Sequence, residues 1–394
     1  MTATSKRPCP ICTSNEIDFL HEMNFKLPAS SPLPTYYRIV CCKVCGMVYA
    51  DSESCQSDYD TYYECFSKYE DTKISSGGGY SIIDRERLQD TANTIMKHHN
   101  IDASIVDIGC ANGGLLDELH NLGCNKLTGI DPSLASIDYI KNKGYTGYAS
   151  NITNLTELDI GLYNGVILSH VLEHIYDLKS TLEIIKSLLC FNGFVYIEVP
   201  NASSYFKHYV VPYYYFDSEH INHFDITALD NLANIHGFEV IECAEKLINV
   251  NGYINYPAIY IILKYTGLNN QNNLKLSSSL KLSVLEFIKQ SAKDEIQKKI
   301  LYYYDSKEPI ILWGAGSYTQ RLMTTTQLSN CNIVAIVDND RKKQGLYIDS
   351  ILIRKPEVLK DVVGVILIIS ALHSNDIKND ILNLGLKHKI DVLI

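Results

Sequence analysis

The sequence predicts an α/β protein built around a parallel sheet, with a small cysteine-rich module before it and a second, smaller α/β domain after it. Short β-branched segments alternate with amphipathic segments from residue 102 onward. This alternation is typical of parallel strands joined by right-handed helical crossovers. Seven of the 12 cysteines precede residue 66. A second alternating segment begins near residue 310, after a polar, asparagine-rich stretch over 266–277 that predicts a linker.

The first segment, residues 1–75, is predicted to be a zinc-binding module. It is too small to bury a large core, so it should need a covalent or metal staple. It contains two CxxC pairs separated by 29 residues, namely Cys9 and Cys12, then Cys42 and Cys45. Two such turns can direct four thiolates at one tetrahedral metal ion, which predicts a structural zinc. Redox disulfides are the alternative, and Cys41 adjoins Cys42 but has the wrong spacing to Cys45.

The composition limits the partners and the compartment. Lysine and arginine number 35 against 45 aspartates and glutamates, which gives a net charge of −10. Such an acidic chain is a poor candidate for binding a nucleic-acid backbone. No apolar run reaches the roughly 18 residues that span a bilayer, and the N-terminus does not read as a signal peptide. We therefore expect a cytoplasmic protein with neither a nucleic-acid nor a membrane partner.

The central segment, residues 76–268, is predicted to carry the parallel sheet. We expect strands over 105–108, 127–130, 166–168 and 194–197, and helices over 115–122, 134–143 and 178–189. The first strand runs into the glycine loop Asp107-Ile-Gly109-Cys-Ala-Asn-Gly113. This loop lacks the Gly-Lys-Ser/Thr of a triphosphate loop and the Gly-x-Gly-x-x-Gly of a dinucleotide loop.

An acid also ends the second predicted strand, at Asp131, 24 residues after Asp107. In such sheets this acid accepts hydrogen bonds from the ribose hydroxyls of an adenosine ligand. The strand over 166–168 runs into Ser169-His170-Val-Leu-Glu-His174. Because the ligand crevice lies at the carboxyl ends of parallel strands, we expect these side chains to converge with the glycine loop.

These motifs, in this order, resemble those of the class I S-adenosylmethionine-dependent methyltransferases over roughly residues 80–265. The resemblance implies a Rossmann-like sheet and S-adenosylmethionine as the cofactor. It implies that Gly109 and Gly113 allow close approach of the methionine part, that Asp131 holds the ribose, and that Asn151 lies near the adenine. The cofactor-binding residues that it implies are Asp107, Gly109, Gly113, Asp131, Asn151, Ser169 and His170. An α/β sheet without a cofactor is the alternative.

The order of a four-cysteine module, this core and a small α/β domain is similar to that of the zinc-containing sugar C-methyltransferases. Members of that family act on nucleotide-linked deoxy keto-sugars, so the resemblance implies a nucleotide-sugar substrate and a monomer or homodimer. Glu219-His220 looks like the family's Glu-His motif. The family commonly has a tyrosine two residues before this glutamate, where this chain has Asp217.

Methylation at carbon needs a base that titrates near neutrality, which favours histidine. We take His220 as the base that removes the proton beside the keto group, with Glu219 or Glu173 as its carboxylate partner. His174 is the second candidate and could donate a hydrogen bond to the enolate oxygen. Two other functions stay open: an O- or N-methyltransferase of another polar metabolite, and an inactive zinc-bearing binding or scaffold protein. Tyr69 or Tyr80 could also face the substrate.

The last segment, residues 269–394, is predicted to begin with a helix over 280–304 and to form a second α/β domain with strands over 310–313, 333–337 and 365–369. Its loop carries Gly314 and Gly316, but Thr319 stands at the third glycine of a dinucleotide fingerprint, and Asp338 follows the next strand. This degenerate fingerprint predicts an incomplete nucleotide-binding fold. In the resembled family this domain helps frame the nucleotide-sugar cleft, whereas packing or dimerisation is the alternative role.

Overall fold

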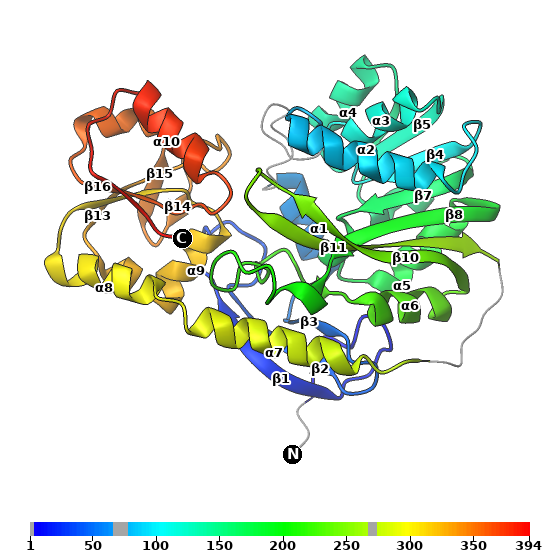
Figure 1. Cartoon of the computed structure of the whole chain (residues 1–394), viewed down its shortest axis with the longest axis horizontal. Coiled ribbons are helices and arrows are strands. Elements are labelled where there is room, and N and C mark those ends of the chain that lie inside the picture. Colours follow the sequence, from blue (N-terminus) through cyan, green and yellow to red (C-terminus); the bar gives the residue numbers. More distant parts are fainter. Residues whose placement is uncertain (1–3, 66–77, 267–273) are drawn as a thin grey trace. The chain divides into compact units, whose positions relative to one another are not determined.

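The computed structural model describes residues 4–65, 78–266 and 274–394, and it confirms the predicted α/β class (Figure 1). Its strands are β1 Ile17–Asn24, β2 Tyr36–Cys42, β3 Val48–Asp51, β4 Ser104–Ile108, β5 Lys126–Asp131, β6 Thr146–Ala149, β7 Tyr163–Ser169, β8 Leu189–Pro200, β9 Asn222–His223, β10 Phe238–Asn249, β11 Asn255–Tyr265, β12 Ile310–Trp313, β13 Ile333–Val337, β14 Tyr347–Ile348, β15 Ile351–Arg354, β16 Val365–Ile368 and β17 Ile390–Val392. Its α-helices are α1 Gln56–Cys65, α2 Ile82–Met96, α3 Gly114–Asn121, α4 Leu134–Asn142, α5 Leu178–Ser187, α6 Ile226–Ile235, α7 Ser278–Ala292, α8 Ile296–Ser306, α9 Ser317–Thr325 and α10 Ser374–Asn383. Among the described residues, no helix is both long and apolar enough to cross a membrane.

The contacts divide the chain into two compact units. Unit 1 comprises Met1–Phe19, Val40–His208 and Glu219–Val284, and unit 2 comprises Leu20–Ile39, Tyr209–Ser218 and Leu285–Ile394. The strands β1 and β2 and the helix α7 each have residues in both units. The three domains expected from the sequence were predicted as independently folding units. A division of the chain by contacts does not test independent folding, so these domains stay a prediction.

The sheet of the central segment has seven strands in the order β10-β11-β8-β7-β4-β5-β6. The five strands from β8 to β6 are parallel, and β11 runs antiparallel to both β8 and β10. Each parallel strand is followed by a crossover, so the loops after β4, β5 and β7 all emerge at the carboxyl edge of the sheet. The four strands predicted over 105–108, 127–130, 166–168 and 194–197 are β4, β5, β7 and β8.

Both faces of this sheet are buried over its central strands β4, β7 and β8, which explains why these strands read as nearly continuous apolar runs. Alternate residues point to opposite faces, so Val106 joins the core beneath α5 and α6 while Ile105 joins the core beneath α2, α3 and α4. The two layers of helices lie on opposite sides of the sheet (Figure 1).

The cysteine module forms its own sheet, in the order β1-β2-β3-β9. The strand β9 comes from far along the chain and pairs antiparallel with β3, with Val48 opposite His223 and Tyr49 opposite Asn222. The amide of Ala50 also donates to the carbonyl of Ile221, at 2.8 Å. The loop that ends in Glu219-His220 therefore continues into a strand of the cysteine module.

The carboxyl-terminal sheet has six strands in the order β14-β15-β13-β12-β16-β17, parallel apart from the β14–β15 pair. One core packs beneath α8 and α9, and a second core packs beneath α10. The helical stretch predicted over 280–304 consists of two helices, because α7 ends at Ala292 and α8 begins at Ile296. Between the two helices, the Asp294 carboxylate accepts a hydrogen bond from the amide of Ile296 at 2.9 Å.

The end of the predicted linker over 266–277 is held in place rather than free. The backbone of Lys275 exchanges two hydrogen bonds with the Asn231 side chain, at 2.7 and 2.8 Å. The amide of Ser277 donates to the carbonyl of Cys45 at 3.0 Å. Ser277 thereby packs against Gly46, the residue that follows the second cysteine pair. The residues 267–273 of this stretch lie outside the described part of the chain.

We predict that Gly46→Ala lowers the melting temperature by at least about 4 °C more than Gly144→Ala. Both glycines have positive φ, +79° and +97°, so both variants bear the cost of a left-handed alanine. At Gly46 the added Cβ would also overlap the carbonyl oxygen of Ser277, whereas nothing lies within 4 Å of a Cβ at Gly144. Thermal melts of the two variants measure the difference, and equal melting temperatures would contradict the close approach of Ser277.

Candidate functional site

The four cysteines predicted as zinc ligands come together in the cysteine module. The Sγ atoms of Cys9 and Cys45 are 3.5 Å apart, and those of Cys12 and Cys42 are 3.4 Å apart. All four sulfur atoms lie within 4.8 Å of one another. Tetrahedral zinc with Zn–S bonds of about 2.3 Å needs sulfur separations of roughly 3.8 Å, so this group fits a zinc ion.

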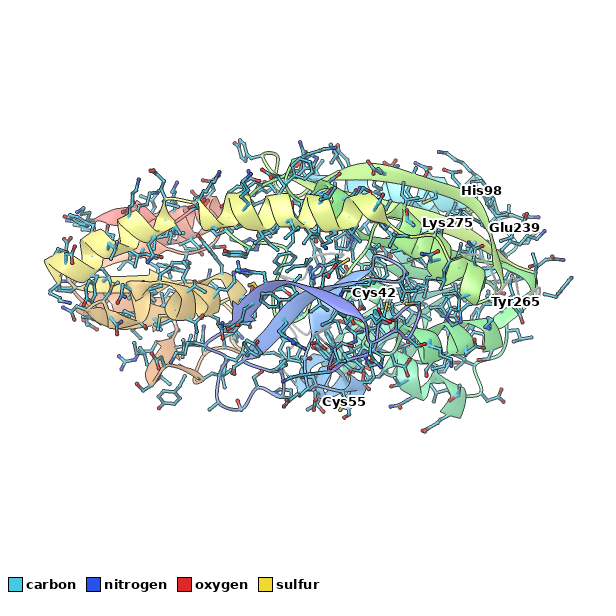
Figure 2. All side chains as sticks on the ribbon, turned by 90° about the horizontal axis from the view of Figure 1, so that it is seen from below. Cys42, Cys55, His98, Glu239, Tyr265 and Lys275 are labelled. Carbon is cyan, nitrogen blue, oxygen red and sulfur yellow. The ribbon has the colours of Figure 1, made fainter. Side chains whose placement is uncertain are left out.

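The other nearby cysteines do not belong to this group. Cys41 points elsewhere, with its Sγ 3.5 Å from the carbonyl oxygen of Gly46, which agrees with the choice of Cys42 from the spacing. Cys55 is exposed and lies apart from Cys42 (Figure 2). Hydrogen bonds from the three other thiols lower the pKa of Cys42, and hydrogen bonding to these neighbours raises the pKa of Cys45. Four adjacent thiolates would repel one another unless a cation lay between them. The group is therefore suited to bind a divalent cation.

The glycine loop joins β4 to α3 at the carboxyl edge of the seven-stranded sheet. Gly109 and Gly113 have φ of +79° and +73°, a region that disfavours other residues. A Cβ at Gly109 would come within 2.6 Å of Val171, and one at Gly113 within 2.7 Å of Ile140. Gly109 therefore lets the loop lie against the segment that follows β7, which brings the β4 and β7 loops together as expected, and Gly113 lets the loop lie against α4.

Two buried carboxyl groups lie beside this loop. Asp131, at the end of β5, accepts hydrogen bonds from the amides of Ala111 and Ser133, both at 2.9 Å. Burial raises the pKa of Asp131 to about 6, although these two amides partly oppose the effect. Burial, with the charge of Asp131 added, raises the pKa of Asp107 to about 8. Each oxygen of Asp131 accepts one amide and keeps a lone pair that can accept a ligand hydroxyl.

Asn151, predicted near the adenine, follows β6, and its amide nitrogen donates to Glu64 of α1 at 2.5 Å. Thr153 contacts the same helix through Asp60, at 3.2 Å. The helix α1 thus packs against the segment that was expected to contact the adenine.

His170 follows Ser169, the last residue of β7, and lies in a buried ionic network. Its Nδ1 is 3.2 Å from Glu173 and its Nε2 is 3.1 Å from Glu198. Burial alone would lower the pKa of His170, but the two carboxylates outweigh it and raise the pKa to about 9. Lys246 also contacts Glu198, at 2.7 Å. Because both ring nitrogens face carboxylates, His170 is held as a cation and is unsuited to act as a base.

The remaining candidates form one cluster next to this network. One ligand-capable atom from each of Glu173, His174 and His220 lies within 4.8 Å of the others, and the two histidine rings are 4.7 Å apart between centroids. Glu173 is fully buried, and its Oε2 has no hydrogen-bond partner among the described residues. The Glu219 side chain instead faces α1. The carboxylate nearer to the two histidines is therefore Glu173.

Two tyrosines of α1 belong to this cluster and were not predicted. Tyr62 donates to Glu219 Oε1 at 2.6 Å, and the Tyr63 hydroxyl lies 2.6 Å from His174 Nδ1. More than 100 residues separate them from His174, and no spacing rule connects the two segments. Tyr80, a sequence candidate, is 48% exposed, and Tyr69 lies outside the described residues.

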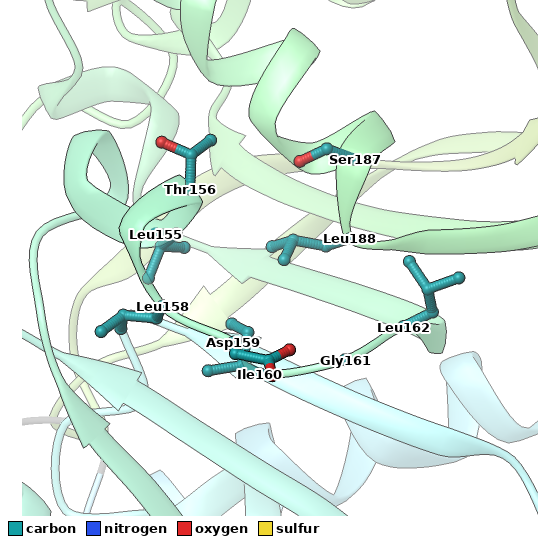
Figure 3. Close-up of a pocket in the computed structure, with 9 residues that line it drawn as sticks. All are labelled: Leu155, Thr156, Leu158, Asp159, Ile160, Gly161, Leu162, Ser187 and Leu188. Carbon is teal, nitrogen blue, oxygen red and sulfur yellow. The ribbon is translucent and has the colours of Figure 1, made fainter.

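A separate hollow of about 460 Å³ lies near the amino ends of β7 and β8, between the segment Leu155–Leu162 and the pair Ser187–Leu188 (Figure 3). Asp159 is its one titratable lining residue. The hollow lies at the edge of the sheet opposite to the glycine loop, because its lining residues precede β7 and β8 rather than follow them. It does not form part of the candidate active site.

The carboxyl-terminal sheet repeats the arrangement of the first loop. The amide of Ala315 donates to Asp338 at 2.7 Å, as Ala111 does to Asp131. Thr319 is fully buried, and its hydroxyl donates to the carbonyl of Gly314 at 2.6 Å. The side chain at the degenerate third glycine position thus bonds its own loop. Lys343 lies 3.4 Å from Asp338.

Comparison with known proteins agrees with this geometry. Residues 80–243 match the family model described as a methyltransferase domain. Residues 306–390 match a second model, described as C2185-like, N-terminal. No relative of the chain was found among the curated proteins.

The solved structures most similar to the chain include three methyltransferases. One is an S-adenosylmethionine-dependent methyltransferase from Methanosarcina mazei, with 17% identity, coverage of 43% of this chain and 96% of that chain, and a TM-score of 0.37. Another is the 1,6-didemethyltoxoflavin-N1-methyltransferase of Burkholderia thailandensis, with 13% identity, 56% and 95% coverage, and a TM-score of 0.38. The third is the N-methyltransferase NodS of Bradyrhizobium japonicum, with 13% identity, 50% and 98% coverage, and a TM-score of 0.38.

The family match covers the glycine loop, the acid at the end of β5 and the parallel strands of the seven-stranded sheet. Residues 80–243 of this chain therefore form a methyltransferase domain.

Proposed function

We propose that the enzyme transfers a methyl group to the carbon beside the keto group of a nucleotide-linked deoxy-sugar. The observation that carries the proposal is the cluster of His174, His220 and Glu173, of which Glu173 and His174 follow β7 at the carboxyl edge of the sheet. A carbon acceptor needs a base to form its nucleophile, and two adjacent histidines supply a base and a hydrogen-bond donor. The second candidate function, methyl transfer to oxygen or nitrogen, has less need of such a pair of histidines.

In this mechanism, each residue has one role. S-adenosylmethionine, when bound, supplies an electrophilic methyl group. Asp131 would hold the ribose of this cofactor, and the loop from Gly109 to Gly113 would lie against its methionine part. The His220 imidazole takes the proton from the carbon beside the carbonyl. His174 donates a hydrogen bond to the oxygen on which the enolate charge develops. The two histidines together would hold the substrate as a stabilised enolate, whose carbon is the nucleophile for the methyl group that the cofactor would supply.

We also propose that the four-cysteine group holds a structural zinc. Four sulfur ligands leave no open position on the metal, so it would have no direct part in the chemistry.

The first test of this proposal is the metal content. Protein purified without chelator should contain about one zinc per chain by elemental analysis. Cys42→Ser should lose this zinc and melt at a lower temperature, yet still bind S-adenosylmethionine, because the metal stabilises the cysteine module rather than the glycine loop. The exposed Cys55→Ser is the matched control and should keep its zinc. Wild-type protein with well under one zinc per chain would remove the claim.

The second test concerns the ribose acid. Asp131→Ala should weaken S-adenosylmethionine binding by about 1.5–3 kcal/mol, the scale for losing hydrogen bonds to a charged group. Since burial raises the pKa of Asp131 to about 6, the carboxylate is lost as the pH falls through this value. Wild-type affinity should therefore drop about tenfold from pH 7 to pH 5, and the variant should lack this drop. Calorimetric titration measures both effects, with Asp138→Ala, an exposed position on α4, as the control.

The third test separates carbon from oxygen or nitrogen transfer. If His220 is the base, the enzyme should exchange deuterium from solvent into the keto-sugar without methyl transfer, with S-adenosylhomocysteine bound to complete the site. His220→Ala should slow this exchange by about 10²–10⁴-fold and leave cofactor affinity nearly unchanged. His373→Ala, at an exposed position, is the control. A loss of exchange under tenfold would indicate His174 as the base. A product methylated on oxygen, formed without any deuterium exchange, would favour the second candidate function.

A further inference from the structure

Asn222 lies on the short strand β9 and is buried, with 1% of its surface exposed. Its side-chain Nδ2 donates one hydrogen bond to the carbonyl of Leu172 at 2.8 Å and another to the carbonyl of Ile175 at 2.7 Å. These two carbonyls flank the pair Glu173-His174, which lies in a turn of 3₁₀ helix. One amide group thus holds both ends of the turn that carries two members of the candidate catalytic cluster.

The partners of the Asn222 amide fix its orientation. A carbonyl oxygen can only accept a hydrogen bond, so the group that faces Leu172 and Ile175 must be the NH2 group. On its other side, the Arg7 guanidinium, which can only donate, lies 3.0 Å from Oδ1. The opposite orientation would place the amide oxygen against two carbonyls and the NH2 group against a cation.

The backbone joins the same two segments. The amide of Ile221 donates to the carbonyl of Glu173 at 2.9 Å. Together with the two bonds from the Asn222 side chain, it ties residues 172–175 to residues 221–222, all of them in unit 1. His174 lies within the first segment and His220 immediately precedes the second, and their rings are 4.7 Å apart between centroids. The separation of the two rings therefore depends on this junction.

We propose that Asn222 is a positioning residue of the methyl-transfer centre, which fixes the separation of the His174 and His220 rings through the two hydrogen bonds that its amide donates. The proposal rests on the proposed function for the roles of the two histidines. A base and a hydrogen-bond donor that act on one substrate must keep a fixed separation, and a displacement of about 1 Å can cost about 10²-fold in rate. The polar atoms of the Asn222 side chain are engaged in the contacts described, so Asn222 acts through the histidines.

The test uses Asn222→Asp, which keeps the shape of the side chain and an oxygen for Arg7 but replaces the NH2 group with a second acceptor. The adjacent guanidinium keeps the new carboxylate charged, so both donated hydrogen bonds are lost. Asn231→Asp is the matched control, because Asn231 on α6 is also 1% exposed and its amide donates to the backbone of Lys275 at 2.7 Å. Asn222→Ser, a neutral side chain too short to reach both carbonyls, is the second variant.

The first readout needs no substrate. It is the nuclear Overhauser cross-peak between the ring protons of His174 and His220, in deuterated protein with protonated histidine, assigned with His174→Gln and His220→Gln. Wild-type protein and Asn231→Asp should give this cross-peak, because the two rings are 4.7 Å apart between centroids. In both Asn222 variants the cross-peak should fall to less than half of its wild-type intensity, because this intensity decreases with the sixth power of the proton separation.

The second readout is kinetic. With an accepted substrate, both Asn222 variants should lower kcat by about tenfold or more with little change in KM, whereas Asn231→Asp should leave kcat near the wild-type value. If no keto-sugar is methylated while the cross-peak responds as described, the proposed function fails and the role of Asn222 in holding the two histidines stands.

Four results would overturn the proposal. They are a cross-peak retained in both Asn222 variants, an equal loss of the cross-peak in Asn231→Asp, an unchanged kcat, and a failure of both Asn222 variants to fold in thermal melts. The last result would show that Asn222 serves the stability of the fold rather than the separation of the histidines.

Discussion

The pairing of β9 with β3 is the constraint on which the candidate site depends. It makes the residues that follow Glu219-His220 a strand of the cysteine module, while His174 and Glu173 follow a strand of the methyltransferase sheet. Arg7 stabilises the same junction. Its guanidinium is fully buried and donates to the carbonyl of Tyr176 at 2.5 Å and to the side chain of Asn222 at 3.0 Å. Burying an arginine without a carboxylate partner is costly, and these acceptors and the Tyr176 ring, 4.3 Å away, offset the cost.

The proposed zinc site would therefore have a consequence beyond the stability of its own module. Cys42 and Cys45 flank the turn between β2 and β3, and β3 in turn pairs with β9. The helix α1, which carries Tyr62 and Tyr63, follows β3 directly. A module with little core of its own, held together by a metal, would thus orient both the loop of His220 and the tyrosines that contact His174 and Glu219.

The carboxyl edge of the sheet also concentrates buried charge. Glu198 is fully buried, yet His170 and Lys246 hold its pKa below the usual range against the effect of burial. Glu173 shares His170 with it and has one oxygen left over. Buried polar networks are costly when a member is left unsatisfied, so the partly satisfied carboxylate beside two histidines is the feature on which the proposed catalytic role of this cluster rests.

Local sequence determined the parts of this protein whose physics is local. The CxxC turns, the left-handed glycines at 109 and 113 and the acid that ends β5 depend on a few neighbouring residues, so each was readable from spacing alone. The break between α7 and α8 is also local, but the turn at Asp294 was hidden within an apolar pattern that continues across it. Only the tertiary structure decided that α1 supplies Tyr62 and Tyr63, that Glu173 rather than Glu219 lies nearest the histidines, and that β9 joins the cysteine module. Those contacts join segments more than 40 residues apart in the sequence. Contacts over such separations depend on how the elements pack, and a short-range sequence pattern carries no information about that packing.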